Sequence, residues 1–117
     1  MKTKTETTAQ EVLRLLSTVP ANRWDRLGYI NDDQTKCCAL GHLFRLKYKQ
    51  GKYNFTRSEC HPHPINKLAE KFIQERYGIP AKCLASVNDS KSVNNYNQKG
   101  IKARVIALLK DMAKAGY

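Results

Sequence analysis

The stretch QKGIKARVIALLKDMAKA, residues 98–115, decides the fold class of this chain. Its apolar side chains recur every three or four residues, so a helical backbone places them on one stripe. The stripe consists of Ile101, Val105, Leu108, Leu109 and Met112. Gly116 follows as a helix stop signal. We therefore predict a C-terminal amphipathic helix that packs its stripe against the rest of a helical domain.

Three earlier segments show the same helical period. Residues 8–19 predict a helix in which Thr8 and Glu11 are spaced as a capping box. Residues 37–48 predict a second helix, and residues 65–77 predict a third. Gly78 is a typical stop for that third helix.

The segment around Gly51 also has a second interpretation. Its apolar residues alternate with polar ones, which is typical of a β-hairpin. They are Leu46, Tyr48, Tyr53 and Phe55. We therefore predict a mainly α fold, with an α-rich α+β fold as the alternative.

The length of 117 residues fits one domain. We expect a compact single domain of about four amphipathic helices over residues 8–117, after a flexible tail over residues 1–7. Residues 81–98 are rich in Asn and Ser and predict a long polar connection, which either takes part in function or is a linker.

The charge balance indicates the class of partner. Lysine and arginine number 21 against 10 aspartates and glutamates, so the formal net charge is +11, which favours a polyanion. No run of about 18 apolar residues and no apolar signal core is present. We expect a cytoplasmic protein without a membrane partner, whose four cysteines are reduced.

The positive charge is concentrated in residues 36–57, which contain no aspartate or glutamate. Lysine and arginine neutralise phosphates, and aromatic rings offer stacking surfaces to unpaired bases. The predicted nucleic-acid contacts in this stretch are Arg45, Lys47, Tyr48, Lys49, Lys52, Tyr53, Phe55 and Arg57. This combination favours single-stranded or looped RNA over DNA. The alternative is that the rings belong to the core and the lysines cover it.

A second cationic surface is predicted on the C-terminal helix. At roughly 100° per residue, Lys99, Lys110 and Lys114 fall on one ridge beside the apolar stripe. This ridge either extends the nucleic-acid surface or is a solvated face. A phosphorylated small ligand and an acidic protein are the other partners compatible with the charge.

One group of residues is compatible with an enzyme. Cys38 and His42 are four residues apart on one helix face, and Asn88 or Asp89 is able to orient a histidine. A thiol near a helix N-terminus has a lowered pKa, so hydrolase or transferase chemistry is the main alternative to binding. A buried cysteine and a hydrogen-bonded structural histidine explain the same residues, and we expect no enzyme.

The cysteines and histidines also include zinc-ligand types. Cys60, His61 and His63 lie close in sequence, and Cys37, Cys38 or Cys83 would have to complete a site. No Cys-x-x-Cys pair is present. We therefore expect neither a metal nor another cofactor.

Several short motifs together resemble one family. Trp24, the Cys-x-x-Gly of Cys38 and Gly41, the Asn88-Asp89 pair and a Val-rich C-terminal helix are similar to a pattern in small uncharacterised bacterial and phage proteins. The resemblance spans about residues 20–113. It implies no settled activity, and a packing role explains the matching positions as well as a functional site does.

This chain departs from the family pattern in two places. Val87 stands where an aromatic often precedes the Asn-Asp pair, and the basic, aromatic stretch after residue 43 is peculiar to this chain. By analogy with small phage proteins, a counter-defence role is predicted, in which the protein inhibits a host ribonucleoprotein by competing for its guide RNA, as an anti-CRISPR protein does.

Overall fold

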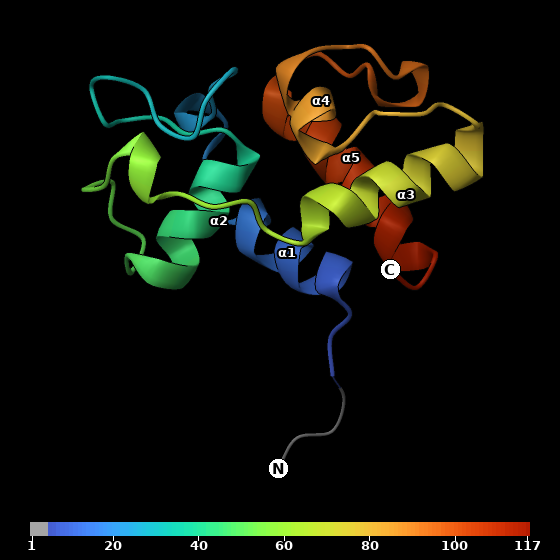
Figure 1. Ribbon diagram of the computed structural model, residues 1–117, viewed down its shortest axis with the longest axis horizontal. Coiled ribbons are helices and arrows are strands. Elements are labelled where there is room, and N and C mark those ends of the chain that lie inside the picture. The colour runs from blue at the N-terminus through green and yellow to red at the C-terminus, as the bar shows by residue number, and fades with distance from the viewer. Residues whose placement is uncertain (1–4) are drawn as a thin grey trace.

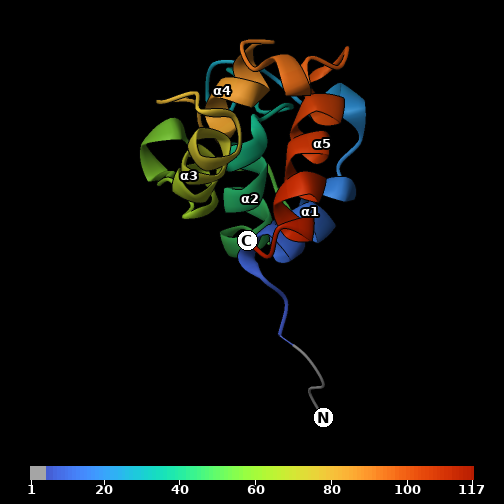
Figure 2. The same ribbon diagram turned by 90° about the vertical axis from the view of Figure 1, so that its right-hand side faces the viewer.

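The C-terminal helix α5 (Ile101–Lys114) forms one side of the core in the computed structural model, which describes residues 5–117. The predicted apolar stripe is buried, apart from the partly covered Ile101 at its start. Helix α1 (Thr8–Ser17) packs against α5, and the two lie side by side in Figures 1 and 2. The main-chain amide of Ala9 donates to the carbonyl of Tyr117 at 3.2 Å, so the start of α1 meets the chain end.

The capping box of α1 lies one residue earlier than predicted. The Thr7 hydroxyl accepts from the Gln10 amide at 3.2 Å, and the Gln10 side chain accepts from the Thr7 amide at 2.9 Å. In the helix that begins after Thr7, the side chains of Ala9, Val12 and Leu16 are buried in the core. Gln10 occupies the third helical position, where glutamine completes a capping box as glutamate does.

The predicted tail over residues 1–7 lies partly outside the described residues, at positions 1–4. Its last part is attached to α1. Thr7 caps the helix, and the Glu6 carboxylate accepts two hydrogen bonds from Arg14, at 2.8 and 2.9 Å.

The predicted second and third helices are confirmed as α2 (Ala39–Tyr48) and α3 (Ile65–Tyr77). The hairpin alternative is wrong. After α2 the chain turns back on the helix end, because the Gly51 amide donates to the carbonyl of Arg45 at 2.8 Å. This return uses the left-handed backbone of Gln50 and Gly51, at φ 55° and 80°, and builds no strand ladder.

The predicted polar connection over residues 81–98 contains more regular structure than expected. It contains a further helix, α4 (Leu84–Asp89), and a 3₁₀ turn at Asn94–Tyr96. Tyr96 is buried, and its hydroxyl donates to the Asp111 carboxylate at 2.8 Å. Residues 5–117 therefore contain five α-helices, one more than predicted.

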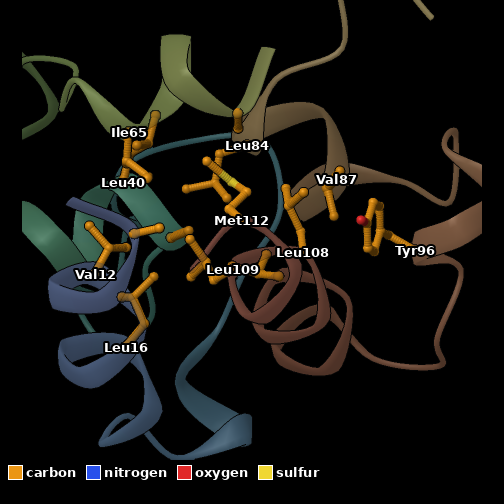
Figure 3. Close-up of a cluster of buried hydrophobic side chains, with 14 of the residues drawn as sticks. Val12, Leu16, Leu40, Ile65, Leu84, Val87, Tyr96, Leu108, Leu109 and Met112 are labelled. Atoms are coloured by element: carbon orange, nitrogen blue, oxygen red, sulfur yellow. The ribbon is translucent and has the colours of Figure 1, made fainter. Parts of the chain in front are cut away.

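All five helices contribute to the main core. Figure 3 shows Leu40 and Ile65 facing Val12 and Leu16 at one end, and Val87 near Tyr96 at the other. A smaller cluster of Ile30, Cys37, Phe44 and Phe55 packs on the outer side of α2.

The mainly α prediction is confirmed. Residues 5–117 form no β-strand, and the only extended pairing among them is an isolated bridge between Trp24 and Cys37. Among the helices of this described part, none combines the length and apolar composition needed to cross a membrane.

Candidate nucleic-acid interface and the Cys38 cavity

Arg45 is a structural residue, and its predicted phosphate contact is wrong. Its side chain is buried, with the residue 6% exposed. Nε donates to Nδ1 of His42 at 2.8 Å, and Nη1 donates to the carbonyl of Gly51 at 2.6 Å. The guanidinium also lies over the Tyr53 ring, 4.2 Å from the centroid. The number of lysines and arginines in a stretch of sequence does not reveal that one of them is buried and hydrogen-bonded within the protein.

Two of the predicted stacking rings are also taken up by the fold. Phe55 is buried against Phe44, with ring centroids 5.3 Å apart, so its predicted base contact is wrong. Tyr53 is partly buried and already stacks on Arg45, with Arg23 5.8 Å from the same ring.

Tyr48 is the ring of this stretch that faces solvent. It is the last residue of α2 and is 57% exposed. Phe44, one turn earlier, lies 5.4 Å from it, and His61 approaches at 5.3 Å from the loop before α3. Two neighbouring rings therefore hold Tyr48 in place while leaving more than half of the residue accessible.

Two of the lysines around Tyr48 have partners and are partly covered. Lys47 pairs with Glu11 at 3.2 Å, and Lys49 pairs with Glu59 at 2.9 Å. Pairs of this kind near the surface contribute at most about 1 kcal/mol, so a phosphate competes with them readily. Lys52 forms no ion pair within residues 5–117.

We call Lys47, Tyr48, Lys49, Lys52 and His61 the Tyr48 surface. Arg57 lies further along the same loop. It is also exposed, and donates to the carbonyl of Ile30 at 3.0 Å and to the Asp32 carboxylate at 3.4 Å.

The predicted ridge on the last helix is incomplete. Lys99 precedes α5, which begins only after Gly100 at φ 97°, so Lys99 does not share a helix face with the other two lysines. Lys110 and Lys114 are exposed on α5. The C-terminal end of α5 lies apart from α2, as Figure 1 shows.

Cys38 does not have the lowered pKa expected of a thiol at a helix start. It is the N-cap of α2, and its Sγ accepts from the Gly41 amide at 3.5 Å. Burial nevertheless raises the pKa of the thiol, because desolvation of the thiolate outweighs the helix N-terminus. The thiol is therefore neutral at physiological pH.

His42 is not placed as a base for that thiol. Its Nδ1 accepts from Arg45, so Nε2 carries the proton and donates to the carbonyl of Arg23 at 2.8 Å. Burial and the nearby guanidinium lower its pKa to about 4. Both ring nitrogens have partners other than Cys38, and the arrangement contains no activated nucleophile.

The Asn88-Asp89 pair joins α4 to the start of α2. The buried Asn88 side chain accepts from the Ala39 amide and donates to the carbonyl of Asp25, both at 3.0 Å. It also donates at 2.9 Å to Oδ1 of Asp89, and that atom accepts from the Leu27 amide at 2.9 Å.

Gly41 and Trp24 complete the same junction. A Cβ atom at Gly41 would lie 1.8 Å from the carbonyl oxygen of Tyr29, so a larger residue forces the loop away. The Trp24 indole donates to the carbonyl of Val19 at 3.3 Å, and its ring packs 5.4 Å from His42. Trp24, Gly41 and the Asn88-Asp89 pair thus meet where α2, α4 and the loop between Trp24 and Cys37 join.

A cavity of about 280 Å³ opens beside this junction. The residues that line it are Leu27, Gly28, Tyr29, Cys38, Leu40, Pro62, Asn66, Ala85 and Asp89. We call it the Cys38 cavity. Only Cys38 and Asp89 of this lining are identifiable as candidates from the sequence, because the walls come from four separate segments.

The potential metal ligands are not gathered. Within residues 5–117, no group of three or more His, Cys, Asp or Glu is arranged to hold a metal ion. His61 packs on Tyr48, and His63 accepts from the Ile65 amide at 3.0 Å. Burial raises the pKa of Cys60 to about 11, which disfavours the thiolate that a metal binds.

Comparison of the chain with protein-family models, with curated proteins and with solved structures finds no match.

Proposed function

We propose that this protein binds single-stranded nucleic acid, RNA in preference to DNA, through the Tyr48 surface. The observation that carries the proposal is the position of Tyr48, a large aromatic residue 57% exposed and held by Phe44 and His61. A base that stacks on such a ring contributes about 1–3 kcal/mol.

The charge around Tyr48 supports the same function. Lys47, Lys49 and Lys52 follow one another at the end of α2, where the Lys52 amide donates to the carbonyl of Lys49 at 2.9 Å. Cations beside a stacking ring are the usual arrangement of sequence-tolerant single-strand binding. The formal net charge of +11 adds a long-range attraction for any phosphate chain.

Ring packing also lowers the entropic cost of binding. Phe44 and His61 are 5.5 Å apart with their rings nearly perpendicular, and each contacts Tyr48. A stacking side chain that is already held loses less rotamer freedom when a base arrives.

The test is the affinity for a short fluorescent RNA, compared with DNA of the same sequence. Tyr48→Ala removes the stacking surface and should weaken binding by about 5- to 150-fold, which corresponds to the stacking energy above. Tyr48→Phe keeps the ring and should bind like the original chain. Thermal unfolding of both variants checks that the fold is intact.

Two results would contradict the proposal. One is equal RNA affinity of Tyr48→Ala and Tyr48→Phe. The other is an affinity that stays flat between low and physiological salt, because phosphate contacts release counterions. Tighter binding to the DNA strand would overturn the preference for RNA.

The counter-defence role predicted from the sequence is a special case of this proposal. It requires the protein to displace guide RNA from a ribonucleoprotein, and Tyr48→Ala should then lose inhibition in parallel with RNA affinity.

A further inference from the structure

The Cys38 cavity and the Tyr48 surface are neighbours. Leu40 and Pro62 line the cavity and also line a smaller pocket of about 50 Å³, which Tyr48 and His61 border. A nucleic-acid strand with one base stacked on Tyr48 would therefore have neighbouring nucleotides near the opening of the cavity.

The walls of the cavity suit a flat ring system. Leu27, Leu40, Pro62 and Ala85 supply apolar surface, and Tyr29 adds an aromatic ring. A volume of about 280 Å³ lies just below the range of roughly 300–1,000 Å³ found for pockets of drug-sized ligands. The size thus favours one ring system over a larger molecule.

The polar groups of the cavity indicate which hydrogen-bonding groups a bound ring would carry. Oδ1 of Asp89 already accepts from Leu27 and Asn88, whereas Oδ2 receives no hydrogen bond within residues 5–117. Oδ1 of Asn66 accepts from the Ala85 amide at 2.9 Å, which leaves its amide nitrogen as a donor without a partner in this part of the chain. A matching ligand offers a donor to Oδ2 of Asp89 and an acceptor to the amide of Asn66.

The backbone at the cavity mouth is strained. Leu27 adopts a left-handed conformation at φ 60°, in which a non-glycine residue is uncommon, and it is 74% exposed. The hydrogen bond from its amide to Asp89 holds it there at 2.9 Å. Strain of this kind concentrates at ligand-binding sites.

A cation stands beside the same mouth. The exposed Arg26 precedes Leu27, and its guanidinium donates to the carbonyl of Asp89 at a long 3.4 Å. A nucleotide whose base enters the cavity would bring its phosphate to this side, where a guanidinium recognises it.

From these observations we propose that the Cys38 cavity receives one unstacked nucleobase that carries an exocyclic amino group, with the amino group donating to Oδ2 of Asp89. Adenine, cytosine and guanine have such a group, and uracil does not. In uracil the ring N–H lies between two carbonyl oxygens, which a carboxylate repels. The inference rests on the proposed function where the base belongs to a bound strand.

The experiment uses an oligouridine and three versions of it with one central uridine replaced by adenosine, cytidine or guanosine. We expect the replaced strands to bind about 3- to 10-fold more tightly than the all-uridine strand. Asp89→Asn keeps one oxygen for the Leu27 amide and turns the other position into a donor. It should abolish this preference, because the new amide donor no longer accepts from an exocyclic amino group.

A second variant distinguishes loss of the base site from a change in folding caused by the substitution at Asp89. Ala85→Leu fills the cavity from α4 without removing any hydrogen bond of Asp89, and it should abolish the same preference. Ser92→Leu, at an exposed position outside the cavity lining, is the matched control and should retain the preference.

A separate arm distinguishes a strand from a free nucleotide as the source of the base. Cytidine monophosphate and uridine monophosphate are each added to protein labelled with nitrogen-15. The backbone amide signals of Leu27 and Cys38 are then followed by NMR. We expect cytidine monophosphate to shift both signals and Asp89→Asn to remove the shift.

The outcomes separate the two proposals. Equal binding of all four strands overturns the base site and leaves the Tyr48 surface standing. If no strand binds but cytidine monophosphate shifts the cavity signals, the RNA function fails and the base site holds. If neither occurs, both fail.

Discussion

At the scale of single residues, His42 shows how the fold uses its polar groups. It is fully buried, accepts from Arg45 and donates to the carbonyl of Arg23. A protonated imidazole would lose its acceptor and meet the guanidinium at 2.8 Å. The pKa of His42 is therefore lowered to about 4, and neutral His42 is part of the folded state.

This arrangement predicts a dependence of stability on pH. The unfolded chain takes up a proton at His42 near pH 6.5, whereas the folded chain does so only near pH 4. Stability should fall as the pH drops from about 6.5 to 4, with a contribution of about 3 kcal/mol from His42. The pKa of the half-buried His63 is also lowered, which acts in the same direction.

Urea unfolding between pH 7 and 4 measures this loss. His42→Gln keeps a donor and an acceptor but does not titrate, so its stability should vary much less over that range. His61→Asn, at the exposed histidine, is the control and should follow the original chain. A pH profile of His42→Gln identical to the original would show that His42 is not the group responsible.

At the scale of elements, the junction between α2 and α4 depends on one side chain. Ala39 is the first residue of α2, and its amide has no partner within the helix. The missing acceptor is Oδ1 of Asn88, which lies near the C-terminal end of α4 and accepts from the Ala39 amide at 3.0 Å. The order of the loop before α2 thus depends on α4.

Asn88→Ala should destabilise the fold strongly. It leaves the Ala39 amide and the carbonyl of Asp25 without their partner at a buried site, which costs about 2–5 kcal/mol in total. Chemical denaturation measures the change, with Asn95→Ala at an exposed position as the control. A loss below about 0.5 kcal/mol would mean that another group or water replaces Asn88.

The elements also show what could be predicted from sequence. Helix α5 was recognisable because its stripe repeats over 14 residues, whereas α4 has only six, fewer than two turns, and lies among polar residues. Helix α2 was predicted, yet its first seven residues are all buried, including Arg45. The periodicity of the sequence does not distinguish a solvent-exposed lysine or arginine from a buried one that forms hydrogen bonds inside the protein.

The candidate site was predicted in part for the same reason. Tyr48 and the lysines beside it were identifiable from composition, since the stretch lacks acids. The prediction for Phe55 is wrong because the composition of a stretch does not show which of its rings are covered. The position of His61 beside Tyr48 and that of Leu27 at the cavity are not predictable from the sequence, because both arise only from segments that the fold brings together.

At the scale of the whole molecule, the excess of positive charge has two effects of opposite sign. Among like charges, added salt screens repulsion and should raise the stability of the free protein. The same salt should weaken RNA binding, because the release of counterions into a more concentrated salt solution is less favourable. A melting temperature that falls with salt would show that attractive ion pairs outweigh the net charge.

The salt dependence also tests which cations touch the strand. For single strands, log K falls with log salt by about 0.7 for each phosphate neutralised. Lys52→Ala removes an exposed cation of the Tyr48 surface and should reduce that slope by about 0.7. Lys91→Ala removes another exposed cation, between α4 and α5, and should leave the slope unchanged. Equal reductions in both variants would mean that the strand follows the general field of the molecule and not the Tyr48 surface.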